Sequence, residues 1–168
     1  MTWTLEDDVL APRERIEINY SGPNPFSVCK KITSSVIKRV FEVGGTDVWE
    51  RDFRWDITGD PRPFYMRMFV NKGFDARTGV VFEITYQGAQ PSDPTKDGNV
   101  VIRIGGRMKT TFERETTFQK SSIYYGLLWL YNKIFYSGVR RNYLKIAQQR
   151  IDEFNKQVRG ILGMPTMG

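Results

Sequence analysis

The sequence predicts an α+β fold in which a curved antiparallel sheet of five to six strands wraps around a long C-terminal helix, with another helix inserted after the first strand. Three patterns lead to this prediction. Apolar residues recur every three to four positions over 25–43 and again over 121–162, which is the period of a helix. Between 47 and 112 they alternate with polar residues, as in strands that bury one face. The order of these segments along the chain is typical of an α+β domain.

The chain of 168 residues has the length of a single domain, and its 40% hydrophobic and 26% charged residues are typical of a globular protein. We expect one domain over 13–163. The acidic stretch 1–12 shows little pattern, so we expect a flexible lead-in there, and 164–168 should form a short tail. The first residues lack a secretory signal, and a single cysteine cannot form an internal disulfide, so the expected location is cytoplasmic.

The first elements are a strand and a helix. Three apolar residues alternate with polar ones over 16–20, which predicts the strand. Asn24 and Pro25 predict the helix start, because an Asn side chain can cap free amides and Pro suits the first turn. The helix should continue to residue 43 and stop at the glycine pair 44–45. Its apolar stripe contains Cys29, which we expect to be a core residue rather than a nucleophile.

The central part predicts an antiparallel meander, with turns at TGDPRP and NKGFDARTG. Strict alternation assigns the inward-facing residues of its strands: Trp49, Arg51, Phe53, Trp55 and Ile57; Phe64, Met66, Met68 and Val70; Val80, Phe82, Ile84 and Tyr86; and Val100, Ile102 and Ile104. The pair Gly105-Gly106 that follows fits either a hairpin turn between two strands or a kink in one long strand.

The segment Ser121–Leu144 is apolar around nearly its whole circumference and then becomes basic. Its apolar part, 123–136, is shorter than the about 20 residues that span a bilayer and contains Asn132 and Lys133, so we expect no transmembrane helix. Helices that are apolar on all sides are usually buried. We therefore expect this part to lie buried against the concave face of the sheet, and Trp129→Ala to cost ~3–5 kcal/mol of stability.

The order of elements from Ile16 to Leu162 resembles the START-like helix-grip fold, also called SRPBCC. The resemblance rests on this order rather than on a motif, and one helical segment stands here where the family has two short helices. It implies an apolar cavity between the sheet and the C-terminal helix, where family members commonly bind lipids, sterols, polyketides or other hydrophobic ligands. We therefore expect non-catalytic binding of a hydrophobic or amphipathic, lipid-like small molecule.

The residues expected to line this cavity share the concave side of the sheet and the facing side of the C-terminal helix: Trp49, Arg51, Phe53, Trp55, Met66, Met68, Phe82, Tyr86, Tyr125 and Trp129. Methionine and aromatic side chains suit an adaptable ligand-binding wall, and the same side chains suit a filled core. Arg51 is the most informative, because alternation places it among aromatic residues. It must pair, stack on a ring or reach water, so it either anchors the acidic head of a ligand or extends to solvent.

The chain lacks the residues that several kinds of catalytic and metal-binding site require. The chain has no histidine and one cysteine, which excludes His-dependent nucleophilic catalysis and a structural zinc site. Oxygen ligands alone could still hold Mg²⁺ or Ca²⁺, but no phosphate-binding glycine loop and no calcium loop is present, so we expect no cofactor and no metal. Glu50, Asp52 and Asp56 share one face of a strand, but alternation places that face opposite the aromatic residues, in solvent. Nothing in the sequence positively supports an enzyme.

The charge distribution suggests two other partners. Residues 120–159 hold eight basic and two acidic residues, and the rest of the chain is balanced, so this segment carries the whole net charge of +6. One alternative is RNA or ribosome binding through the side chains of Lys133, Arg140, Arg141, Lys145, Arg150 and Lys156. The other is contact with an anionic membrane surface, through the Arg140-Arg141 pair and Tyr124, Tyr125, Trp129, Tyr131 and Tyr136.

Overall fold

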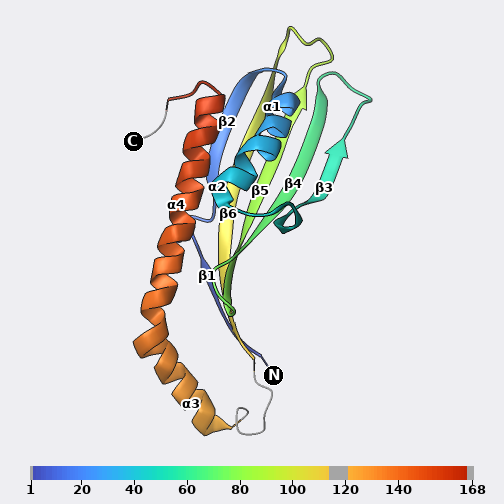
Figure 1. Cartoon of the computed structure of the whole chain (residues 1–168). Coiled ribbons are helices and arrows are strands. Elements are labelled where there is room, and N and C mark those ends of the chain that lie inside the picture. Colours follow the sequence, from blue (N-terminus) through green and yellow to red (C-terminus); the bar gives the residue numbers. More distant parts are fainter. Residues whose placement is uncertain (1, 114–120, 166–168) are drawn as a thin grey trace.

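The computed structural model describes residues 2–113 and 121–165 (Figure 1). Lys120 of the basic segment and residues 166–168 of the expected tail lie outside these ranges. Six strands form one antiparallel sheet: β1 (Trp3–Asp8), β2 (Ile16–Pro23), β3 (Val48–Trp55), β4 (Arg62–Gly73), β5 (Thr78–Gln90) and β6 (Asp97–Phe112). The helical segments are α1 (Pro25–Lys31), η1 (Ile32–Val36), α2 (Ile37–Phe41), η2 (Gly45–Asp47), α3 (Ser122–Tyr131), η4 (Asn132–Tyr136) and α4 (Ser137–Ile161). The predicted α+β class, the antiparallel sheet and the long C-terminal helix are confirmed.

The N-terminal residues form a strand, so the expected flexible lead-in is wrong for β1. This strand pairs with the second half of β6, from Trp3 opposite Phe112 to Asp8 opposite Arg107. The rings of Trp3 and Phe112 stack with their centroids 5.2 Å apart. The acidic residues of this stretch hid its alternation, and the folded body begins near residue 3 rather than 13.

The glycine pair Gly105-Gly106 lies within one continuous strand, which decides between the two alternatives left open by the sequence. β2 pairs with β6 before the pair and β1 pairs with β6 after it. The connection from β1 to β2 passes close to the pair: Val9 N donates to Gly106 O at 2.9 Å. A Cβ on Gly105 would lie 2.8 Å from the carbonyl oxygen of Glu14, so this crossing requires glycine.

The helix expected at 25–43 is present from Pro25 to Phe41, with one π-helical turn in its middle. Pro25 begins the helix as predicted, but the Asn24 cap and the glycine stop are wrong. Asn24 adopts a left-handed conformation and makes no capping bond; its side chain accepts a hydrogen bond from Gln90 instead. At the other end Glu42, not a glycine, takes the left-handed position. Lys72 donates to the Glu42 carbonyl oxygen at 2.9 Å and Arg150 pairs with its carboxylate at 2.7 Å, so tertiary contacts hold this conformation.

A β-bulge in β3 breaks the alternation on which the sequence analysis relied. Glu50 lies opposite Met68 but Asp52 lies opposite Arg67, so Arg51 has no residue opposite it. The bulge turns Trp49 and Arg51 to the outer face of the sheet, away from the helices, where both contact the Phe69 ring. Their predicted place on the inner wall is therefore wrong.

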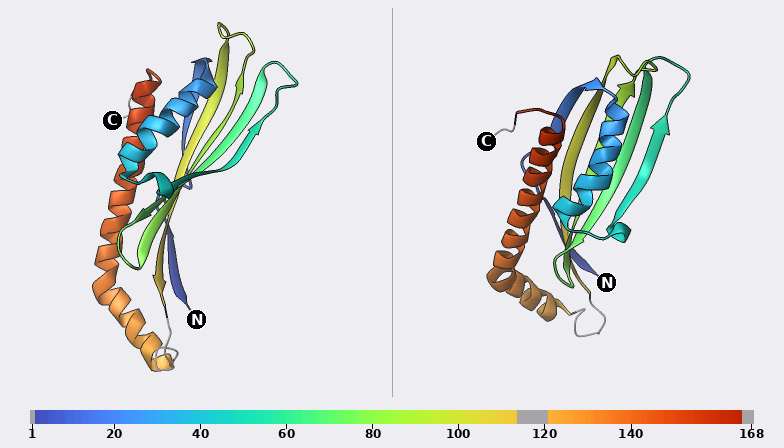
Figure 2. Two further views of the ribbon diagram at one scale, coloured as in Figure 1. Left: turned by 45° about the vertical axis from the view of Figure 1, so that its right-hand side comes forward. Right: turned by 45° about the horizontal axis from the view of Figure 1, so that its top comes forward.

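The alternation predicted for the other strands of the meander is confirmed. Their inward residues are buried: Phe64, Met66, Met68, Val70, Val80, Phe82, Ile84, Tyr86, Val100, Ile102 and Ile104. The α1–α2 segment and α4 lie on the same side of the sheet (Figure 2). The centroid of the Phe41 ring in α2 lies 4.5 Å from that of Phe82 and 5.8 Å from that of Phe154 in α4. Side chains therefore fill this part of the space between the sheet and the helices.

The apolar helix α3 is not buried as predicted, because it projects past the end of the sheet (Figure 1). Among the described residues of α3 and η4, Leu128 and Tyr136 are buried, both against Phe112 at the end of β6. The helix-covered face of the sheet is already occupied by α1–α2 and by α4. Large apolar side chains of this region are exposed instead: Ile123, Tyr125, Leu127, Trp129, Leu130, Tyr131, Ile134 and Phe135.

Candidate functional site

A groove about 860 Å³ in volume lies between α1 and the inner side of β3 and β4. Phe26, in the first turn of α1, is one of its lining residues. The centroid of the Phe26 ring lies 4.1 Å from the Trp55 ring centroid and 5.8 Å from the Phe53 ring centroid. These aromatic residues and Met66 give the groove an apolar floor. After the bulge in β3, Phe53 lies opposite Met66 and Trp55 opposite Phe64, on the helix side of the sheet.

Charged groups stand around this apolar floor. Lys30 and Lys31 line the groove from α1, and Glu50 lines it from β3. The Lys30 ammonium lies 4.9 Å from the centroid of the Phe26 ring, where the ring face attracts a cation. The indole N–H of Trp55 is buried and has no hydrogen-bond partner among the described residues. The groove therefore combines apolar contact area with a cationic edge.

The ten residues predicted to line a cavity do not form one wall. Phe53, Trp55 and Met66 line the groove, whereas Met68, Phe82 and Tyr86 lie in the core. Burial raises the pKa of Tyr86 above its ordinary value, and its hydroxyl accepts a hydrogen bond from Thr33 at 3.3 Å. The remaining four residues lie elsewhere: Trp49 and Arg51 on the outer face, and Tyr125 and Trp129 on α3.

Sequence analysis missed the half of the groove that the first helix supplies. Phe26, Lys30 and Thr33 follow one another at spacings of four and three, which places them on one side of α1 and η1. That spacing is visible in the sequence. The prediction for this helix used only its stripe of core residues.

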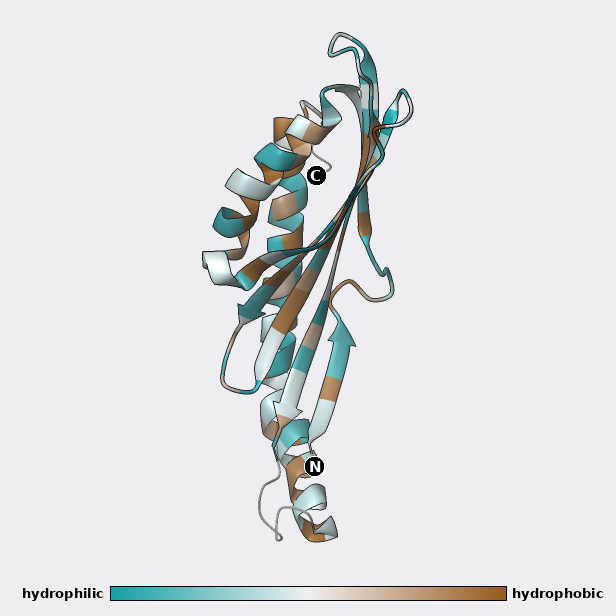
Figure 3. Cartoon of the chain, turned by 90° about the vertical axis from the view of Figure 1, so that its right-hand side faces the viewer, coloured by the Kyte–Doolittle hydropathy of each residue, from teal (hydrophilic) through white to brown (hydrophobic). Residues whose placement is uncertain are grey.

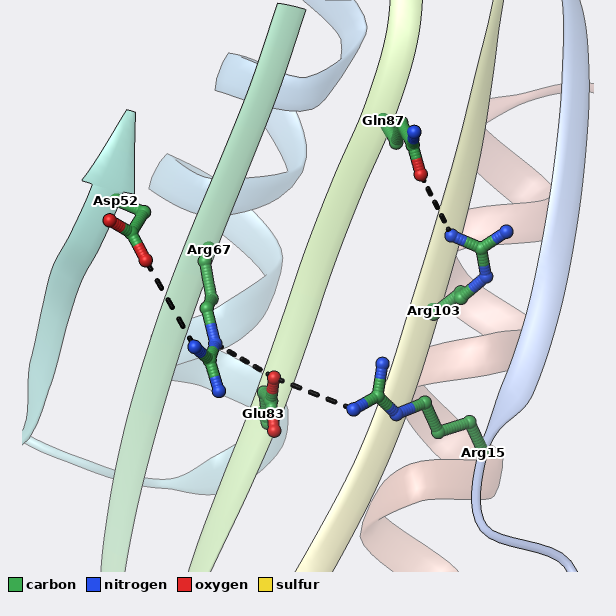
Figure 4. Close-up of polar contacts among 6 residues, drawn as sticks. All are labelled: Arg15, Asp52, Arg67, Glu83, Gln87 and Arg103. Atoms are coloured by element: carbon green, nitrogen blue, oxygen red, sulfur yellow. Dashed lines mark hydrogen bonds and ion pairs between the residues drawn. The ribbon is translucent and has the colours of Figure 1, made fainter. Parts of the chain in front are cut away.

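The outer face of the sheet carries a network of ion pairs (Figure 4). Arg67 donates to Glu83 at 2.8 Å and lies 4.0 Å from Asp52, and Arg15 approaches Glu83 to 3.7 Å. The hydrogen bond to Glu83 raises the pKa of Arg67 above its ordinary value. These four charged side chains therefore have partners within the fold.

The predicted acidic trio is not brought together. Glu50 lines the groove, Asp52 pairs with Arg67 on the outer face, and Asp56 accepts two hydrogen bonds from Thr58 in the turn after β3. The bonds from Thr58 hold the pKa of Asp56 below its ordinary value. Within 2–113 and 121–165, no three acidic or cysteine side chains gather closely enough to hold a metal ion.

Cys29 is a buried core residue, as the sequence predicted. Burial raises the pKa of its thiol to about 12. At neutral pH the group is therefore protonated and a poor nucleophile.

The six basic residues of the alternative surface differ in their surroundings. Arg140 pairs with Asp7 of β1, and Arg150 pairs with Glu42 after α2. The other four side chains are exposed: Lys133, Arg141, Lys145 and Lys156. Two of the six predicted cations therefore form ion pairs that join α4 to the rest of the fold.

Comparison with known proteins gives no functional assignment. No protein-family model and no curated protein matches the chain. Among solved structures, a Staphylococcus aureus protein of unknown function, SA2116, is similar over 89% of this chain and 94% of its own, with 8% identity and a TM-score of 0.27. A similarity at this level carries no argument about fold family or function.

Proposed function

We propose that the protein binds an amphipathic, lipid-like small molecule in the groove between α1 and β3–β4 and performs no chemistry on it. The observation that carries the proposal is the combination of Phe26, Phe53 and Trp55 on the floor with Lys30 at the edge. Burial of an apolar chain against these rings contributes favourable binding free energy, and the ammonium group attracts an acidic head group.

The proposal moves the ligand from the place that the family resemblance implies. Between the sheet and α4, the rings of Phe41, Phe82 and Phe154 are in contact and fully buried. The order strand, helix, meander and C-terminal helix supports a divergent helix-grip domain, and we include that assignment in the proposal. The separation of Glu50, Asp52 and Asp56 supports binding without catalysis. The free, buried Cys29 supports the cytoplasmic location expected from the sequence.

Calorimetric titration with dodecanoate and with dodecanol tests the proposal. Phe53→Ala should weaken binding of both ligands by about tenfold or more, since full burial of an aromatic side chain contributes about 1.5–3 kcal/mol. Lys30→Gln should weaken binding of the carboxylate and leave binding of the alcohol nearly unchanged. Trp49→Ala is the matched control, because Trp49 is an exposed aromatic residue of the same strand on the opposite face.

Two results would contradict the proposal. One is that the wild-type protein binds neither dodecanoate nor dodecanol. The other is an equal loss of affinity in Trp49→Ala and Phe53→Ala. Native mass spectrometry of the protein purified from its own cells, at moderate and at high salt, then identifies the natural ligand, because an apolar adduct should survive high salt.

A further inference from the structure

The exposed apolar surface of α3 and η4 is the largest feature that the proposed function leaves unexplained. The exposed fractions are 72% for Ile123, 55% for Leu127, 58% for Ile134 and 68% for Phe135. These residues neighbour one another on two consecutive helical segments. Contiguous exposed apolar surface of this kind marks an interaction site in a folded protein. Figure 3 shows the apolar residues of α3 at the tip of the molecule, far from α1.

The exposed surface extends around much of the helix. Ile123, Leu127 and Leu130 follow one another at spacings of four and three, which places them on one stripe. Trp129 flanks this stripe on one side and Tyr131 on the other, and both are nearly half exposed. One partner helix would cover a stripe of only about 100°. A lipid interface, into which a helix sinks, covers a wider arc.

The charges of this region favour an anionic partner. From residue 121 to residue 151 the chain contains five basic residues and no acidic one. Arg140 and Arg150 are paired with carboxylates of this chain, but Lys133, Arg141 and Lys145 are exposed. A second copy docked through the same surface would bring more positive charge to it. Anionic headgroups would neutralise it.

The aromatic residues fit the same partner. Tryptophan and tyrosine are enriched where a bilayer meets water, because each ring has an apolar body and a polar end. The Lys133 ammonium lies 4.7 Å from the Trp129 ring centroid, so a cation and an amphipathic ring stand together beside the apolar stripe. Within the described residues, no helix is long and apolar enough to cross a membrane.

From the apolar arc, the missing acidic residues and the interfacial aromatic rings, we infer that α3 and η4 dock in the plane of an anionic lipid bilayer. Ile123, Leu127 and Leu130 enter the apolar boundary, and Lys133, Arg141 and Lys145 contact headgroups. The inference is independent of the proposed ligand groove. It rests on different residues at the opposite end of the fold (Figure 1).

Sedimentation with phosphatidylcholine vesicles, with and without about a third phosphatidylserine, tests this inference. We expect binding to the anionic vesicles that weakens with salt. The double substitution Leu127→Ser and Leu130→Ser should lower the affinity at least tenfold. Ile57→Ser is the matched control, because Ile57 is 70% exposed in the turn after β3 and should leave binding unchanged. Arg141→Gln should lower the affinity about fivefold and reduce its salt dependence.

Fluorescence supplies a second measurement that does not depend on sedimentation. The emission of Trp129 should shift to shorter wavelength when vesicles are added, and Trp129→Phe should remove the shift while sedimentation persists. Because Leu127 and Leu130 are exposed, the double variant should fold, which circular dichroism checks.

Other occupants of this surface are defined outcomes of the same experiments, and each overturns the inference. A stable dimer that the Leu127/Leu130 variant dissociates, with no vesicle binding, would identify an interface between two copies of the chain. Co-purifying RNA that salt releases, again with no vesicle binding, would identify a nucleic-acid surface. Equal binding to neutral and anionic vesicles would overturn the assigned role of the cations.

Discussion

The hydroxyl group of Tyr136 in η4 donates a hydrogen bond of 2.6 Å to Asp75 in the turn between β4 and β5. The same hydroxyl lies 2.7 Å from Thr78 Oγ1, which in turn lies 2.9 Å from Thr110 Oγ1 of β6. This chain of polar contacts fastens the junction of α3 and α4 to the end of the sheet. Together with the ring contacts around Phe112, it fixes the angle at which α3 projects.

Tyr136→Phe should therefore destabilise the protein. The substitution keeps the ring against Phe112 and removes a hydroxyl that contacts a carboxylate, so we expect a loss of about 1–2 kcal/mol in the free energy of unfolding. Urea denaturation measures it. Tyr131→Phe, at an exposed position of α3, is the control and should change the free energy little. Equal effects of the two substitutions would show that the Asp75 contact contributes nothing.

The Asp75 contact also predicts a dependence on pH. Burial alone would raise the pKa of Asp75, but hydrogen bonds from Tyr136 and from the amides of Arg77 and Thr78 outweigh burial and hold the pKa below its ordinary value of 3.8. A lowered pKa in the folded state means that the contribution to stability is present above the ordinary value and is lost as the pH falls through the lowered one. The difference in unfolding free energy between wild type and Asp75→Asn should shrink accordingly in acid. Urea denaturation at a series of pH values checks this, and a constant difference would refute it.

Trp129→Ala should cost little stability, contrary to the expectation from sequence. The side chain is 47% exposed, and surface substitutions usually change stability by less than about 0.5 kcal/mol. Phe154→Ala, in the filled space between α2 and α4, should cost ~3–5 kcal/mol. Thermal or urea denaturation of the pair gives the comparison. Similar large losses for both would mean that α3 is buried in solution.

Two glycine substitutions should have effects of opposite sign. In Gly105→Ala the new methyl group would collide with the Glu14 carbonyl oxygen, and such overpacking typically costs ~1–3 kcal/mol. Gly126→Ala on α3 meets no atom within 4 Å and should stabilise the helix by up to about 1 kcal/mol. Denaturation midpoints report both changes. A stable Gly105→Ala protein would argue against the close crossing of the β1–β2 connection over β6.

Cys29 should react with iodoacetamide only after unfolding. The thiol is buried and its raised pKa, about 12, leaves almost no thiolate at pH 8. Mass spectrometry should find the native protein unmodified after a treatment that labels the urea-unfolded chain completely. Rapid native labelling would show that α1 separates readily from the sheet.

Sequence patterns predicted the parts of the fold in which one rule acts without interruption. The inward residues of β4, β5 and the first half of β6 followed from alternation because no bulge interrupts it there. In β3 one extra residue, Arg51, reversed the faces of the residues before it, and alternation alone cannot locate a bulge. The left-handed backbone conformation of Glu42 likewise depends on contacts with Lys72 and Arg150, which are distant in sequence.

The candidate site was only partly predictable for a related reason. Phe53, Trp55 and Met66 were named from their aromatic or sulfur character and strand position, but the opposite wall comes from a helix that the predicted cavity did not include. For α3, an apolar composition shows that a covering surface is needed and does not say which one. The sheet could not supply it, since Phe41 and Phe154 already lie over that face.

The bulge in β3 has one more effect, on how the sheet meets other molecules. Within 2–113 and 121–165, β3 is the last strand of the sheet and pairs with β4 alone, so its outer edge presents unpaired backbone groups. A long, regular edge invites the edge of another molecule to pair with it and leads to aggregation. The irregular backbone at Arg51 and the run of charges from Glu50 to Asp52 make that edge a poor template. The bulge that turns Glu50 toward the groove thus also makes the edge of β3 a poor site for pairing with the sheet of another molecule.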